Sequence, residues 1–370
     1  MQLKQHLYAL IMVSISITFG ILLSEYILSW HQNSIARSSK MATGMMHYHP
    51  ELGWALTPNW KGEHSHHDFS VTYSTDEHGF RQQPREGKST TGRKIALIGD
   101  SFTFGFGVND YETFAAKLAL DDIDNEYLNL GVPGYSTDQE YLLMQQQSKE
   151  NINDYVLIFY LGNDIIDNAL PHPLQAEPAK PFFEVNEGVL VLKNMPVPKT
   201  KKPAVLRSQT LKVILFGNEL NQYAVAFDGL RQKSQILKLL IPQKANTDRA
   251  TINAILDGRL SKQKYLLSVL FKSMQREAKH QQTSLSIAIL PGRSYVVTPD
   301  SYAAIFQEYV RKYVIDLSTS LQINTIDIAT LLRKKYEAGQ TQLFHPNEGH
   351  LTSKGHGIVA GIIQKELIIK

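Results

Sequence analysis

Four short segments of the chain carry side chains that together could catalyse acyl transfer. They are GDSFTFG (99–105) with Ser101, NLGVPGYST (129–137) with Gly134, LGND (161–164) with Asn163, and NEGHLTSKGH (347–356) with His350. A serine hydroxyl becomes an effective nucleophile when an imidazole takes its proton, and the resulting oxyanion needs hydrogen-bond donors aimed at it. Ser101 and His350 would supply the nucleophile and its base. The backbone N–H groups of Ser101 and Gly134 and the side-chain amide of Asn163 would supply the donors.

Each of these residues also has an ordinary structural explanation. A serine after a strand is a common helix N-cap. Gly134 follows a proline and suits a turn with positive φ, Asn163 suits an Asx-turn with Asp164, and His350 could be a surface histidine before a helix. All four fall at element ends in one consistent order, which favours a common site over four separate coincidences.

The elements that must position these residues follow from the hydrophobic pattern after Lys94. Apolar runs of strand length occur at 94–99, 126–131, 155–162, 284–290 and 323–328, and helical periods occur at 112–120, 137–150, 261–280, 301–320 and from about 353 to the end. Several strands are continuously apolar, as expected when helices cover both faces of a parallel sheet. Right-handed βα units then predict an α/β fold with a doubly wound, five-stranded parallel sheet. Ligands bind at the carboxyl ends of such strands, where the four segments fall.

The connection between the third and fourth strands is too long for a single crossover helix. We expect an insertion at about 168–260, containing a hairpin of 182–185 and 189–193, the Pro/Lys-rich segment 196–203, and helices near 208–217 and 250–258. Insertions at this edge of a sheet often form lids or substrate walls, and a purely stabilising excursion is the alternative.

The N-terminus predicts a membrane anchor over residues 1–30. No charge occurs from Leu7 to Leu23, a stretch longer than a signal-peptide core and close to the length that spans a bilayer. Cleavage after Ser34-Ile35-Ala36 is the less favoured alternative. The flanking charges do not decide the orientation. Residues 31–92 form a polar juxtamembrane segment with short strands such as 69–73, and 93–370 is the catalytic domain.

Composition excludes several other classes of function. The chain is 43% hydrophobic with a net charge of +3, which predicts a globular protein and no nucleic-acid partner, and it has no cysteine for thiol or disulfide chemistry. The segment after the first strand lacks the spacing of nucleotide-binding loops. The run His64-Ser65-His66-His67 is interpreted as a solvated loop rather than a metal site, and Lys199 to Lys202 as a solvated linker. No metal and no cofactor are expected, and the oligomeric state is left open.

The four segments resemble the motif blocks of the SGNH hydrolases, also called the GDSL esterase/lipase family. The resemblance covers 94–164 and 284–370, and STDEHGFR (74–81) looks like a segment of membrane-anchored bacterial members. It implies an SGNH/flavodoxin-like fold, with Ser101 as nucleophile, His350 as general base, and Gly134 and Asn163 in the oxyanion hole. It also implies an esterase or acyltransferase acting on O-acyl groups, acetyl first, of an envelope glycan. The expected location is the bacterial inner membrane, with the catalytic domain in the periplasm or outside the cell.

Two positions depart from the family pattern. Leu161 replaces a glycine, and Asn347 occupies the position of the acidic residue three before His350. An amide can accept a bond from the imidazole but cannot stabilise the imidazolium by charge. Glu348 or a backbone carbonyl is a candidate substitute, and His345 is an alternative base.

Besides a substitute for the acid and a different base, the third possibility is that activity is weak or lost. It would make the protein a scaffold that binds glycan or envelope-assembly partners. A lipase or thioesterase using the same residues is a further alternative.

Overall fold

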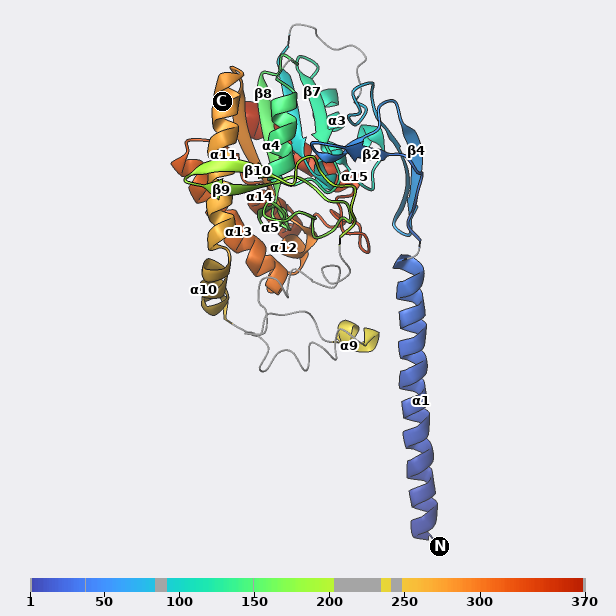
Figure 1. Cartoon of the computed structure of the whole chain (residues 1–370). Helices are drawn as coiled ribbons and strands as arrows, with labels where there is room; N and C mark the ends of the chain where they lie inside the picture. Colours follow the sequence, from blue (N-terminus) through green and yellow to red (C-terminus); the bar gives the residue numbers. More distant parts are fainter. Residues whose placement is uncertain are drawn as a thin grey trace.

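The computed structural model describes residues 2–36, 38–83, 92–148, 150–202, 234–240 and 248–368. The helix expected near 208–217 lies outside the described residues. The rest forms an α/β domain with a long N-terminal helix that projects away from it (Figure 1).

The projecting helix is α1 (Gln2–Ala36), which continues beyond the expected anchor limit at residue 30. Its Lys4–Ile35 portion is long and apolar enough to cross a membrane, by length and composition. Most of the apolar side chains along it are exposed, while Ile35 is buried and the Glu25 carboxylate accepts from the backbone N–H groups of Gln235 and Ile236. A long helix with exposed apolar side chains is what a bilayer-spanning segment requires.

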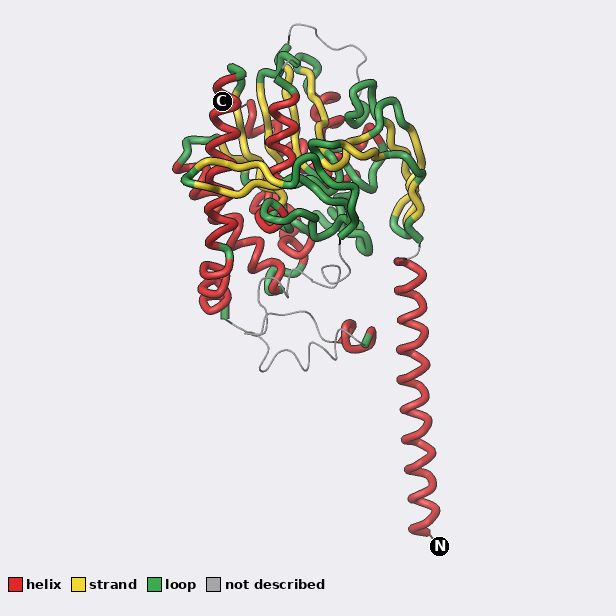
Figure 2. The backbone as a smooth tube through the Cα atoms, in the orientation of Figure 1, coloured by secondary structure: helices red, strands yellow, loops and turns green. Residues whose placement is uncertain are grey.

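The domain is built on a five-stranded parallel sheet with the order β12-β11-β8-β6-β7. Figure 2 shows strands in yellow with helices in red beside them. The strands are β6 (Lys94–Gly99), β7 (Glu126–Gly131), β8 (Asp154–Tyr160), β11 (Ser284–Leu290) and β12 (Asn324–Ile326). The predicted doubly wound, five-stranded α/β fold is thus confirmed. The last strand is shorter than predicted because the Asp327 side chain accepts a bond from Thr330 N at 3.1 Å and begins the next helix.

Helices cover both faces of this sheet. On one face, α4 (Thr137–Gln146) packs on α11 (Ser261–His280), and α11 also contacts α13 (Tyr302–Ser320). On the other face, α15 (Ser353–Ile368) packs on α3 (Phe114–Asp121) and α14 (Ile328–Glu337). The short helices are α2 (Ser101–Phe104), η1 (Asp110–Glu112), α5 (Asp164–Asp167) and α12 (Arg293–Val297). Leu97, Leu157 and Ile287 are fully buried, because both faces of their strands are covered.

Two further regions flank the sheet. The juxtamembrane region contains β1 (Lys40–Met41), β2 (Met46–His49), β3 (Gly53–Leu56), β4 (Lys61–His66) and β5 (Phe69–Ser74); β2 pairs with β3, and the other three form a sheet. The insertion contributes the hairpin of β9 (Phe182–Asn186) and β10 (Val189–Lys193), with α9 (Gln235–Leu240) and α10 (Arg249–Arg259) further along the chain.

Two interpretations of polar runs in these regions are corrected at buried residues. His64 lies in β4 rather than in a solvated loop, and its buried ring bonds Ser39 Oγ at 3.1 Å and Tyr73 Oη at 2.8 Å. Lys199 and Lys201 are exposed as predicted, but Lys202 is buried, and its ammonium group donates to Leu174 O at 2.8 Å. In both cases a tertiary partner compensates the cost of burying the polar group.

Arg81, the last residue of STDEHGFR, ties the juxtamembrane region to the loop that follows Ser101. Its side chain is 0% exposed, and Nε donates to Asp110 Oδ1 at 2.7 Å. Its other nitrogens donate to the carbonyl groups of Phe104 at 3.2 Å and Val108 at 2.8 Å. The guanidinium carbon lies 4.5 Å from the ring centroids of both Tyr73 and Phe104. One buried cation therefore fixes the backbone of the segment after Ser101.

We expect Arg81→Met to lower the free energy of unfolding by about 3–5 kcal/mol, because it leaves buried carbonyl groups without their donor and removes the cation paired with Asp110. Arg93→Met is the matched control, since Arg93 makes a similar two-point contact with Asp154 from a side chain that is 62% exposed. The control should change stability by less than about 1 kcal/mol. Denaturant titration of the full chain in detergent compares the two, and equal losses would contradict the role given to Arg81.

Candidate active site

Ser101 is the first residue of α2, directly after the carboxyl end of β6. The N-cap of this helix is Asp100, whose carboxylate accepts from Phe102 N at 2.8 Å, so the interpretation of Ser101 as the cap is wrong. Burial raises the pKa of Asp100 to about 6. At the other end of the helix Gly105, with φ of 84°, lets the chain reverse while its N–H bonds Ser101 O at 3.0 Å. The hydroxyl of Ser101 is left free for a side-chain partner.

That partner is His350. Ser101 Oγ lies 2.7 Å from His350 Nε2, and His350 Nδ1 lies 2.7 Å from Glu348 Oε1. The other oxygen of Glu348 accepts from the backbone N–H of His350 at 3.0 Å. Burial raises the pKa of Glu348, but its hydrogen bonds with His350 outweigh this and leave the pKa below its ordinary value. The carboxylate is therefore ionised at neutral pH beside the imidazole.

Asn347 does not contact the imidazole, which corrects the expectation that it takes the place of the family's acid. Its Nδ2 donates to Asp68 Oδ1 at 2.6 Å. Asp68 Oδ2 accepts from the backbone N–H groups of Asn347 at 2.8 Å and Glu348 at 2.9 Å. Burial opposes ionisation of Asp68, but these bonds leave its pKa below its ordinary value. Asp68 thus clamps the loop that carries Glu348 and His350.

His345, the alternative base, is placed elsewhere. Its Nε2 lies 3.1 Å from Gly107 O, and its ring packs against Phe69 with 5.0 Å between centroids. Burial lowers the pKa of His345, which favours the neutral ring. Its backbone N–H bonds His350 O at 2.8 Å. His345 therefore supports the loop of His350 instead of facing Ser101.

The candidate oxyanion donors lie at the ends of β7 and β8. Gly134 has a φ of 85°, a backbone conformation that residues with a side chain rarely adopt. Asn163 makes no Asx-type cap; its Nδ2 donates to Asp167 Oδ2 at 2.6 Å. Within the described residues, the N–H groups of Ser101 and Gly134 have no hydrogen-bond acceptor. These groups, with the second hydrogen of Asn163 Nδ2, are available to a ligand oxygen.

Sequence reasoning weighed Glu348 only as a substitute and missed Asp68 and Asp167. Asp167 follows Asn163 by four residues, so the two side chains meet across one helical turn, and that spacing was a usable signal. Asp68 is 279 residues from Asn347, and no local pattern connects them.

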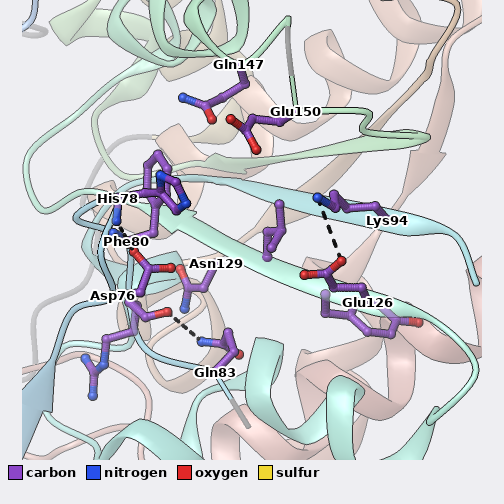
Figure 3. A pocket seen from close by; sticks show the side chains of 12 residues that line it. Asp76, His78, Phe80, Gln83, Lys94, Glu126, Asn129, Gln147 and Glu150 are labelled. Carbon is purple, nitrogen blue, oxygen red and sulfur yellow. Dashed lines mark hydrogen bonds and ion pairs between the residues drawn. The ribbon is translucent and has the colours of Figure 1, made fainter. Parts of the chain in front are cut away.

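Figure 3 shows the lining of a hollow that includes neither Ser101 nor His350. Lys94 and Glu126, which line it, begin β6 and β7, whereas Ser101 follows the opposite end of β6. Its volume of about 70 Å³ has room for a few water molecules only. Among the residues that the structure describes, no group of three His, Asp or Glu side chains is arranged to hold a metal ion.

No protein-family model and no curated protein matches the chain. Matched solved structures include a lipolytic G-D-S-L family protein from Veillonella parvula, with 11% identity, 74% of this chain and 97% of that chain covered, and a TM-score of 0.39. An acetylxylan esterase from Geobacillus stearothermophilus matches with 10% identity, 76% and 96% coverage, and a TM-score of 0.38. The family that the motifs resemble thus recurs among the matched structures.

We expect Glu348→Gln to slow labelling of Ser101 by a fluorophosphonate by about 10²–10⁴-fold, since the equivalent loss of charge in a serine-protease triad costs about 10⁴. Asn347→Ala is the matched control, because it removes one side-chain bond to Asp68 and should cost about fivefold or less. Labelling rates of the full chain in detergent measure both. A larger effect at Asn347 than at Glu348 would contradict the assignment.

We expect Asp167→Asn to lower kcat for an activated ester by about 10–100-fold with little change in KM. Both carboxylate oxygens accept donors, from Asn163 Nδ2 and from Leu174 N at 2.9 Å, and an amide has one acceptor only. If Asp167 acts by orienting Asn163, the double variant with Asn163→Ala should be no slower than Asn163→Ala alone. Additive losses in kcat would show that Asp167 acts independently of that amide.

Proposed function

We propose that this protein is a serine-dependent esterase or O-acyltransferase. The observation that carries the proposal is the chain of hydrogen bonds from Ser101 Oγ through His350 to Glu348. This arrangement is what a serine hydroxyl requires to become a nucleophile at neutral pH, because the base and the group that orients it are both in place.

In the proposed reaction Ser101 Oγ attacks the ester carbonyl carbon while His350 Nε2 takes the hydroxyl proton. The negative charge on the carbonyl oxygen is bound by the N–H groups of Ser101, Gly134 and Asn163. When the C–O bond to the alcohol breaks, His350 returns the proton to the leaving oxygen. Water, or a second hydroxyl, then attacks the acyl-serine with His350 as base, which regenerates Ser101 and releases acid or a new ester.

Glu348 would act on the imidazole and not on the substrate. By accepting the Nδ1–H it fixes the tautomer with a free Nε2, and its negative charge stabilises the imidazolium formed in each step. The sequence departure at Asn347 therefore gives no reason to expect a weakened site, since a carboxylate is supplied by the neighbouring residue.

For the substrate we propose an O-acyl group, acetyl first, on an envelope glycan. The support is the resemblance of STDEHGFR and the four motif blocks to membrane-anchored bacterial hydrolases, together with α1 as the proposed anchor. The catalytic domain would then face the periplasm or the cell exterior.

The test is covalent labelling by a fluorophosphonate probe, with hydrolysis of p-nitrophenyl acetate measured in parallel. Wild type should label, Ser101→Ala should not, and His350→Ala should label at least about 10³-fold more slowly. His345→Ala is the control for losing a nearby histidine and should retain most of the rate. A wild-type protein that neither labels nor hydrolyses the ester would remove the enzyme proposal and favour a binding scaffold.

A further inference from the structure

A groove adjoins the candidate active site on the side of Gly134. One wall is the hairpin of β2 and β3, and the other is formed by segments 176–179 and 198–201 of the insertion. Its volume is about 510 Å³, within the range of small-molecule sites. The juxtamembrane region and the insertion, both outside the motif blocks, therefore build it together.

The groove reaches the candidate oxyanion hole through Trp54. Its Nε1 donates to Pro133 O at 3.0 Å, directly before Gly134. A Cβ atom on Gly134 would lie 3.2 Å from Trp54 Cζ2 and 3.5 Å from Ala176 Cβ. Pro133 lines the groove, and Gly134 beside it packs against Trp54 and Ala176 of the two walls, so a molecule whose ester group is bound at Gly134 can extend between them.

The lining combines an apolar floor with a cationic rim. Met46 is 38% exposed and Tyr48 39% exposed, so both present apolar surface to solvent. Lys199 Nζ lies 4.5 Å from the Tyr48 ring centroid, and no carboxylate among the described residues is paired with it. Lys201 is paired with Glu177 at 3.7 Å, so the described rim carries two lysines and one carboxylate.

The walls are held in place before any ligand binds. Tyr48 Oη donates to Val197 O at 2.6 Å, and Val197 N donates to Pro50 O at 2.8 Å. Gly53, with φ of 84°, packs so closely that a Cβ would lie 2.6 Å from Ala179 O. Because the groove is preformed, little free energy of ligand binding is lost to ordering its loops.

We propose that this groove binds the sugar chain of an acidic glycan, with a carboxylate-bearing residue of the chain at Lys199 and the O-acyl group at Ser101. A sugar ring has one apolar face, which suits Tyr48 and Met46, and a polar edge, which suits the charged rim. A long acyl chain fits less well, because it is stabilised in proportion to the apolar surface it buries and this floor is open to solvent. This inference rests on the proposed esterase or acyltransferase function and specifies its substrate class.

Calorimetric binding to the full-length Ser101→Ala protein in detergent tests the groove separately from catalysis. The probes are an O-acetylated oligogalacturonate, which is acidic, and an O-acetylated xylo-oligosaccharide, which is neutral. We expect Lys199→Ala to weaken binding of the acidic probe by about tenfold while changing the neutral probe less, since one charge-assisted contact is lost. Tyr48→Ala should weaken both. Lys193→Ala, which removes a lysine of β10 outside the groove lining, is the matched control.

Several results would overturn the inference. The first is that the acidic probe does not bind, and the second is that it binds equally well with Lys199 and with Lys199→Ala. The third is a preference for long-chain p-nitrophenyl esters that Tyr48→Ala abolishes, because that result would assign the groove to an acyl chain. If the acidic probe binds as expected but the protein with Ser101 intact never labels with a fluorophosphonate, the groove stands and the proposed enzymatic function fails.

Discussion

The hydrogen bond between Ser101 and His350 joins residues 249 positions apart and depends on a fixed conformation of the loop from His345 to His350. The loop is closed by its own backbone, since His345 N bonds His350 O and Gly349 N bonds His345 O at 3.0 Å. From outside, the Asp68 carboxylate holds it through three N–H donors. Without these constraints the imidazole would sample many orientations, and a base must be held close to one to be effective.

The same constraint explains why the juxtamembrane region belongs to the site. Asp68 lies between β4 and β5, and Arg81, just beyond β5, fixes the carbonyl groups that follow Ser101. Phe69 also packs against His345. The nucleophile and the base are therefore each supported from a segment that precedes the sheet, although Ser101 begins α2 and His350 lies in the loop before α15.

The sequence predicted the sheet well because buried parallel strands are continuous apolar runs, and it grouped Ser101, Gly134 and Asn163 because strand ends converge on one edge. The sequence did not show whether Asn347, Glu348 or a backbone carbonyl is the hydrogen-bond partner of His350, because spacing does not reveal which group faces the imidazole. The contact of Asp68 with Asn347 could not be predicted for a similar reason, because tertiary packing of distant segments brings the two residues together. His64 was misassigned because a run of histidines looks solvated unless its buried partners, Ser39 and Tyr73, are known.

Buried acids near the proposed oxyanion hole raise an electrostatic question, since a charge there would oppose an oxyanion. Burial raises the pKa of Glu140 and of Asp164 well above the ordinary values, and repulsion from Asp100 adds to the effect at both. Burial also raises the pKa of Asp138, and its ion pair with Lys180 offsets part of that rise. Burial therefore favours the neutral, protonated forms of Glu140 and Asp164, because it disfavours a charge that water cannot solvate. The negative charge of Glu348 lies at the imidazole, where it stabilises the cation that forms during the proposed reaction, and the carboxylate of Asp167 orients the amide of Asn163 by accepting from its Nδ2.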